Sequence, residues 1–186
     1  MPAAHGMRAR SRGVFALGLL LLAGCFTVDA RLEPDGSGTI EMEYVPGPHA
    51  TIESETARFT SPHVTVQELA PREVGAFLRA RFDDVTKLPT AEGFSILTIT
   101  RDRKRGEERL RIVVRNSEPK EIAQETRPGP HITITLPGRV VAANRDAEIE
   151  GQRVSWRVPL REYARRSLFM LSVRYATSSR PARSAT

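Results

Sequence analysis

The chain has 186 residues and a formal net charge of +6, and 40% of its residues are hydrophobic and 27% charged. This length predicts about one domain, and the composition excludes a disordered or multiply membrane-spanning chain. Three of the positive charges, Arg8, Arg10 and Arg12, precede Cys25 and no acidic residue does, so the chain from Cys25 onward carries +3. Such a small charge does not demand a nucleic-acid partner, and we expect none.

The N-terminal segment has the three parts of a secretory signal peptide. Basic residues between 8 and 12 are followed by an apolar run at 14–22 and then by the small residues Ala23 and Gly24. The apolar run is shorter than the roughly 20 residues that a transmembrane helix needs. We therefore predict that residues 1–24 are a signal peptide.

The segment Leu22-Ala23-Gly24-Cys25 is similar to the lipobox of bacterial lipoproteins. A thiolate is the strong nucleophile that attack on a lipid donor requires, and small residues let a peptidase reach the bond between Gly24 and Cys25. We predict cleavage at this bond and lipidation of Cys25, the single cysteine, with diacylglycerol of palmitate type. Two or three acyl chains hold firmly, because each buried CH₂ adds about 0.8 kcal/mol. The alternative is an ordinary cleaved signal followed by an unrelated cysteine.

The residue after the cysteine bears on localisation. Phe26 stands where an aspartate would favour retention at the inner membrane of a two-membraned cell. We expect an anchor in the cell membrane or the outer membrane, with the protein facing the periplasm or the exterior. Because the first predicted strand starts almost at Cys25, the domain is expected to lie against the membrane.

Alternation of apolar and polar residues predicts strands along most of the remaining chain. Segments 27–32 and 39–44 flank the turn-forming residues 33–38 and predict a β-hairpin. Further strands are predicted at 64–69, 94–100, 109–115, 132–136, 154–158 and 169–175, with a charged turn at 101–106. Such regular alternation is typical of an antiparallel sheet with one buried face.

One helix is predicted from Pro71 to Val85, where apolar residues recur at helical spacing and proline suits the first turn. Residues 46–62 are predicted to be a loop with a short helix. Together these elements predict an α+β domain over residues 25–176, with an antiparallel sheet of six or more strands packed by one main helix. Residues 177–186 are predicted to be a disordered basic tail.

Three motifs carry a family resemblance: the turn 34–38, the segment Pro137-Gly138-Arg139-Val140 ending at Asn144, and the Val154-Ser155-Trp156 strand. With the cysteine that precedes them, they resemble the LppM-type lipoprotein domain over Cys25 to Tyr175. The resemblance implies a lipid-anchored α+β envelope domain associated with lipid binding, and it transfers no catalytic residues. Members of that family often carry a transmembrane helix after the domain, where this chain has the short basic tail.

The sequence offers no constellation for catalysis, so we predict that the protein is not an enzyme and holds neither cofactor nor metal. It lacks the Gly-x-Ser-x-Gly, Walker and Gly-x-Gly-x-x-Gly motifs. His49, His63 and His131 lack metal-ligand spacing, although folding could still assemble them into a zinc site. The pair Asp83-Asp84 could act as general acid and base, but solvated carboxylates are the simpler interpretation.

Two sets of residues are candidates for lipid contact. An apolar ligand pocket between helix and sheet is predicted to be lined by Phe77, Leu78, Phe82 and Trp156, which could equally be ordinary core residues. Head groups are predicted to contact Arg101, Arg103, Lys104 and Arg105, with Arg161, Arg165 and Arg166 as a second basic group; the alternative for both is a solvated surface.

The predicted function is non-catalytic binding of a lipid or amphiphile. The alternative is an assembly or scaffold lipoprotein that binds another envelope protein.

Overall fold

The computed structural model describes residues 26–104, 106–116, 119, 121 and 129–177. The predicted signal peptide, Cys25, Arg105 and positions 178–186 of the predicted tail lie outside these residues. The predictions made for them therefore stay predictions.

The first sheet has seven strands in the order β3-β4-β2-β1-β7-β10-β9. Its strands are β1 (Thr27–Leu32), β2 (Gly38–Tyr44), β3 (Val64–Arg72), β4 (Gly75–Phe82), β7 (His131–Thr135), β9 (Glu148–Glu150) and β10 (Arg153–Arg157). The predicted hairpin is confirmed by β1 and β2, which pair antiparallel. The sheet is mixed because β1 also pairs in parallel with β7.

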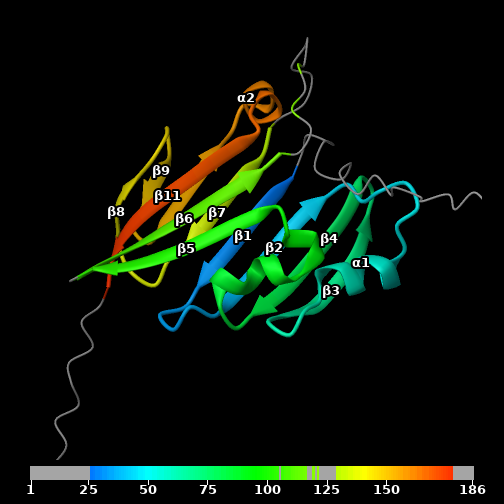
Figure 1. Cartoon of the computed structure of the whole chain (residues 1–186), viewed down its shortest axis with the longest axis horizontal. Helices are drawn as coiled ribbons and strands as arrows, with labels where there is room; N and C mark the ends of the chain where they lie inside the picture. The colour runs from blue at the N-terminus through cyan, green and yellow to red at the C-terminus, as the bar shows by residue number, and fades with distance from the viewer. Residues whose placement is uncertain (1–25, 105, 117–118, 120, 122–128, 178–186) are drawn as a thin grey trace, which may run out of the picture.

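The second sheet has four antiparallel strands in the order β5-β6-β11-β8. Its strands are β5 (Leu97–Lys104), β6 (Glu107–Arg115), β8 (Val140–Ala143) and β11 (Leu168–Ala176). The two sheets face each other, as Figure 1 shows, and bury one continuous apolar core between them. The expectation of a single sheet covered by a helix is wrong, because each sheet covers the buried face of the other.

The helices are few and short, so the α+β class is confirmed with a sheet-dominated architecture. They are α1 (Ile52–Phe59), α2 (Leu160–Arg165) and the 3₁₀ segments η1 (Val85–Thr90) and η2 (Glu92–Phe94). The short helix predicted within 46–62 is confirmed by α1, which begins with a capping box between Thr51 and Ser54. The gap between β5 and β3 is filled by η1, η2 and α1, while β8 lies beside β9 and β10 on the other side.

The helix predicted from Pro71 to Val85 is wrong, because this segment forms the β3–β4 hairpin. Gly75 has φ of 103°, in the left-handed region that suits glycine at a turn. Alternate residues of β4, ending at Phe82, point into the core, whereas Phe77 lies on the opposite face. Phe77 is nevertheless buried, so both faces of the strand are apolar and the spacing imitates a helix.

The molecule has two ends that the pairing registers define. The Phe26 end contains helix α2, the start of β1, the β3–β4 turn and the end of β10. Thr27 pairs with His131 at this end, and Phe26 packs edge-on against Tyr163 of α2. The Gly36 end holds the β1–β2 turn and the β5–β6 turn, which meet where Arg101 packs against Gly36. Figure 1 shows the start of β1 near α2 and both turns at the opposite end.

Candidate functional site

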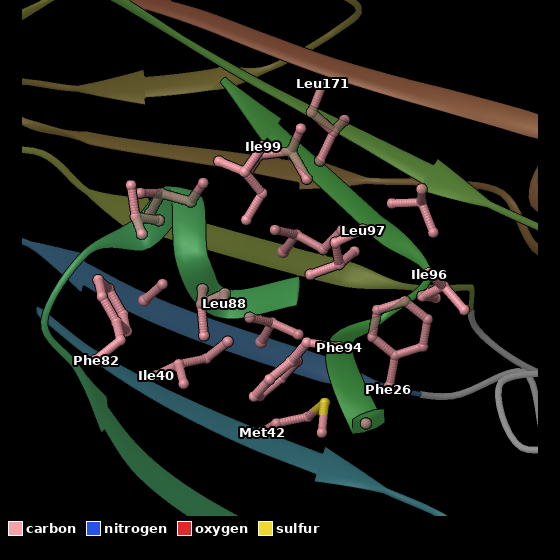
Figure 2. A pocket seen from close by; sticks show the side chains of 18 of the residues that line it. Phe26, Ile40, Met42, Phe82, Leu88, Phe94, Ile96, Leu97, Ile99 and Leu171 are labelled. Carbon is pink, nitrogen blue, oxygen red and sulfur yellow. The ribbon is translucent and has the colours of Figure 1, made fainter. Parts of the chain in front are cut away.

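An apolar cavity of about 110 Å³ lies between the two sheets. It has 22 lining residues, and only Tyr44 and Arg58 among them carry a polar side-chain group. Figure 2 shows side chains from β2, β4, β5, β11 and η1 pointing toward this space from both sheets. Protein interiors are packed as densely as organic crystals, so an apolar void of this size is a distinct feature. Such voids stay dry and accept apolar guests.

The cavity exists because short side chains stand at the centre of the first sheet. Val28 and Ala30 of β1 line it, and both are only partly buried although they face the core. Ile112 of β6, on the opposite wall, is partly buried in the same way. Residues on central strands are normally covered by the facing sheet, so this incomplete burial indicates that the sheets do not close on each other here.

One wall of the cavity is the 3₁₀ segment that links β4 to β5. Leu88 of η1 and Phe94 of η2 point into the space, as Figure 2 shows. A side chain at Gly93 would collide with the ring of Phe59, so glycine lets α1 pack closely against η2. The rings of Phe59 and Phe94 meet edge-on with centroids 5.1 Å apart. Short 3₁₀ pieces with weak hydrogen-bond geometry make this wall easier to displace than the sheets.

The polar edge of the cavity is a group formed by Tyr44, Glu55 and Arg58. The Tyr44 hydroxyl donates to Glu55 Oε2 at 2.6 Å, and Arg58 Nη1 donates to both carboxylate oxygens at 3.1 Å. Burial and the hydrogen bond to Glu55 raise the pKa of Tyr44 well above its ordinary value. The tyrosine is therefore a neutral donor at physiological pH, and Arg58 supplies the one charge on the lining.

The four predicted pocket residues occupy different places. Phe82 lines the cavity, whereas Leu78 is fully buried in the core beside it. Phe77 lies on the outer face, where the guanidinium groups of Arg72 and Arg79 sit 4.9 and 5.5 Å from its ring centroid. Trp156 is buried but does not line the cavity.

A hydrogen bond explains the position of the tryptophan. Its Nε1 donates to the carbonyl of Asn144 at 3.0 Å. Asn144, the last residue of the family motif, also accepts from the amide of Ser172 at 2.7 Å and donates to the carbonyl of Met170 at 2.9 Å. These motif residues therefore hold β8 and β10 to β11 and do not touch the cavity.

The described members of the first predicted basic group, Arg101, Arg103 and Lys104, lie at the Gly36 end, and two of them are ion-paired. Arg101 is ion-paired with the buried Glu108, and Arg103 Nη2 lies 3.2 Å from the same carboxylate. The predicted turn 101–106 is mostly strand, since β5 continues to Lys104, which is exposed. Burial acts to raise the pKa of Glu108, but hydrogen bonding to Arg101 and its charge prevail and lower it.

The second basic group lies on or next to α2, at the Phe26 end. Arg165 lies 3.6 Å from Glu121 and Arg166 lies 3.2 Å from Glu162, while Arg161 has no ion pair among the described residues. Below them, burial raises the pKa of Tyr163 to about 12. This neutral ring connects α2 to the start of β1 through its edge-on contact with Phe26, 5.9 Å between centroids.

The residues considered for catalysis serve other purposes. Asp84 accepts from the amide of Thr86 at 2.9 Å and caps η1, while Asp83 lies 3.1 Å from His63 Nδ1 on the surface. Within the described parts of the chain, no three residues among His, Cys, Asp and Glu come together as metal ligands. The described helices are also all too short or too polar to cross a bilayer.

The geometry defines a class: a two-sheet α+β domain that encloses an apolar cavity. Among solved structures, it is similar to the NMR structure of the folded domain of the LppM protein from Mycobacterium tuberculosis, with a TM-score of 0.52 and 15% sequence identity. The match covers 81% of this chain and 88% of that chain. No family model and no curated protein matches the sequence. The match establishes a shared fold, and function has to be argued from the site.

Sequence reasoning missed most of the cavity lining. The sequence predicts β1 as an ordinary strand, ends the predicted helix at Val85, starts the next strand at Phe94 and assigns no element in between. The ligand space is expected between a helix and a sheet. A partial signal was available in the run from Phe94 to Leu97, where apolar residues continue too densely for a solvated connection. The identity of the facing wall could not be read from the sequence, because it depends on how the two sheets stack.

Proposed function

We propose that the chain is a lipid-anchored lipoprotein of the cell envelope, attached through Cys25, whose domain binds an acyl chain of a lipid or other amphiphile. The domain has no catalytic role in this proposal. The observation that carries it is the cavity between the sheets, with its nearly all-apolar lining. The LppM-like fold and the lipobox-like segment 22–25 support the envelope setting.

The cavity is smaller than the roughly 300–1,000 Å³ of common ligand pockets, so we infer that it represents the closed form. Enlargement requires one wall to move, and the segment 85–94 is the part that the sheets do not hold by strand pairing. An acyl chain would lie along the apolar lining, and a polar head group would find Arg58 and the Tyr44 hydroxyl at its edge.

Photocrosslinking in living cells tests this proposal with the full chain. Cells take up a fatty acid that carries a photoactivatable group and an alkyne, and the crosslinked peptides are mapped by mass spectrometry. We expect crosslinks on lining segments such as 85–99, apart from acyl groups on the peptide that begins at Cys25. Wild-type protein without crosslinks in any lining segment would overturn the proposal.

A matched pair of variants locates the binding. Ala30→Leu places two methyl groups and a methine into the cavity, whereas Ala143→Leu adds the same volume at a partly buried position of β8 outside it. Crosslinking to the lining should fall about tenfold or more in Ala30→Leu, equivalent to about 1.4 kcal/mol, and remain near wild type in Ala143→Leu. Equal losses in both would indicate a general effect on folding and would contradict binding in the cavity.

A further inference from the structure

The Phe26 end carries the most exposed large apolar side chains among the described residues. Val74, in the β3–β4 turn, is 83% exposed, and Leu168, at the start of β11, is 57% exposed. Val74 also borders a surface groove of about 710 Å³ that Phe26 and Pro159 line as well. Exposed apolar side chains that border a groove with a polar rim are typical of contact surfaces.

The same end carries arginines that the fold does not use. Arg115, Arg157 and Arg161 make no ion pair with any other described residue. Arg157 lines the groove beside Val74, and Arg161 lines a second concavity with Arg165 and Arg166. The acidic residues at this end include Glu43, Glu73 and Asp146, which are exposed, together with Glu121 and Glu162, which already contact arginines.

The chain itself indicates what this end faces. Cys25 precedes Phe26 directly in the sequence, and one residue spans at most about 3.6 Å. If acyl chains are attached to Cys25, the head groups of the bilayer lie within a few ångströms of the Phe26 end. The Gly36 end lies at the far end of β1, six residues or about 20 Å from the Phe26 end.

We propose that the Phe26 end is a docking surface for an anionic lipid bilayer. Val74 and Leu168 enter the interface, and Arg115, Arg157 and Arg161 contact lipid phosphates, which are natural partners for guanidinium groups. This inference rests on the proposed lipidation of Cys25 and adds an orientation to it. The domain stands with its strands steep to the membrane, and the Phe26 side of the cavity faces the lipid.

A depth measurement on the lipidated full-length product tests the orientation. Val74→Cys and Leu168→Cys are each labelled with the fluorophore NBD, and the proteins are reconstituted into vesicles of phosphatidylcholine and phosphatidylglycerol. Each variant has one free thiol, because lipid occupies Cys25. The controls are Val141→Cys and Ile149→Cys, which are 47% and 45% exposed and lie toward the Gly36 end.

We expect blue-shifted NBD emission and quenching by spin-labelled lipid at positions 74 and 168, and neither effect at positions 141 and 149. Replacing phosphatidylglycerol with phosphatidylcholine in the vesicles should reduce the difference in NBD emission between positions 74 and 168 and the control positions 141 and 149. Joint reversal in Arg157→Glu/Arg161→Glu should lower the ratio of docked to undocked domains about fivefold per residue, from about 1 kcal/mol for each basic group. The matched control is Arg81→Glu/Arg139→Glu, which changes exposed arginines at the Gly36 end that form no ion pair with any described residue.

The outcomes separate this inference from the proposed function. Protein that lacks lipid on Cys25 and stays in the supernatant refutes the anchor. Protein that floats with the vesicles but gives the same NBD signal at all four positions refutes the docking surface alone. Shielding of positions 74 and 168 in cell membranes, but not in protein-free vesicles, would assign this surface to a protein partner and also refute lipid docking.

Discussion

The two ends of the molecule differ in how their clustered arginines are paired. At the Gly36 end, Arg101 and Arg103 share the buried carboxylate of Glu108, and Arg101 packs against a backbone turn. At the Phe26 end, Arg157 and Arg161 stand exposed with no ion pair among the described residues. The difference shows that a dense run of basic residues does not identify a charged contact surface. The position of the acids on the neighbouring strand decides which arginines are available.

The largest effect is expected from Cys25→Ser, which removes the proposed lipid attachment next to the Phe26 end. The full chain should move from the membrane fraction to the soluble fraction, since the acyl chains supply most of the membrane affinity. The control is Ala23→Gly, which keeps a small residue before the cleavage site and should remain in the membrane fraction. Unchanged fractionation of Cys25→Ser after a high-salt wash would remove the basis for a membrane-facing end.

The next largest effect is expected from Glu108→Gln, which leaves Arg101 without its buried partner. Breaking such a buried pair lowers the free energy of unfolding by about 3–5 kcal/mol, and Glu108 is only 2% exposed. Glu162→Gln at the Phe26 end should lower the free energy of unfolding by about 1 kcal/mol or less, because Glu162 is 33% exposed. Urea denaturation curves of both variants check this, and equal losses would contradict the contrast between the ends.

An acid titration sharpens the same contrast. The folded-state pKa of Glu108 lies below its ordinary value of 4.5. The stabilisation from this group is therefore fully present above about pH 4.5 and is lost as the pH falls through the folded-state pKa. The free energy of unfolding of wild-type protein should fall more steeply between pH 5 and pH 3 than that of Glu108→Gln. Parallel curves would mean that other carboxylates dominate acid unfolding.

The smallest effect on stability is expected at the exposed apolar residues of the Phe26 end. Val74→Ser and Leu168→Ser should change the free energy of unfolding by less than about 0.5 kcal/mol, because both residues are mostly exposed. Thermal unfolding compared with wild type measures this. A loss of about 2 kcal/mol in either variant would show that the side chain supports the fold and is not held ready for a contact.

The strands could be predicted because the alternation of apolar and polar residues indicates which face of a strand is buried, as in β1, β2 and β11. The same rule failed at β4, where Phe77 is buried under Arg72 and Arg79 on the outer face and the alternation disappears. Of the candidate pocket residues, Phe82 faces the cavity because it follows the inward register of β4. The rest of the lining depends on the stacking of two sheets, and the short side chain of Ala30 signals a void only when the opposite wall is known.

The parallel pairing of β1 with β7 has a mechanical consequence. Strand β1, which follows Cys25, is hydrogen-bonded on both sides, to β2 and to β7. A force that pulls on the N-terminus along β1 must therefore break both sets of hydrogen bonds together. Its partner β7 lies more than a hundred residues later in the chain, because Thr27 pairs with His131. If the chain is exported and anchored through Cys25 as proposed, the anchor site emerges long before β7, and β1 is held on both sides only once β7 has joined the sheet.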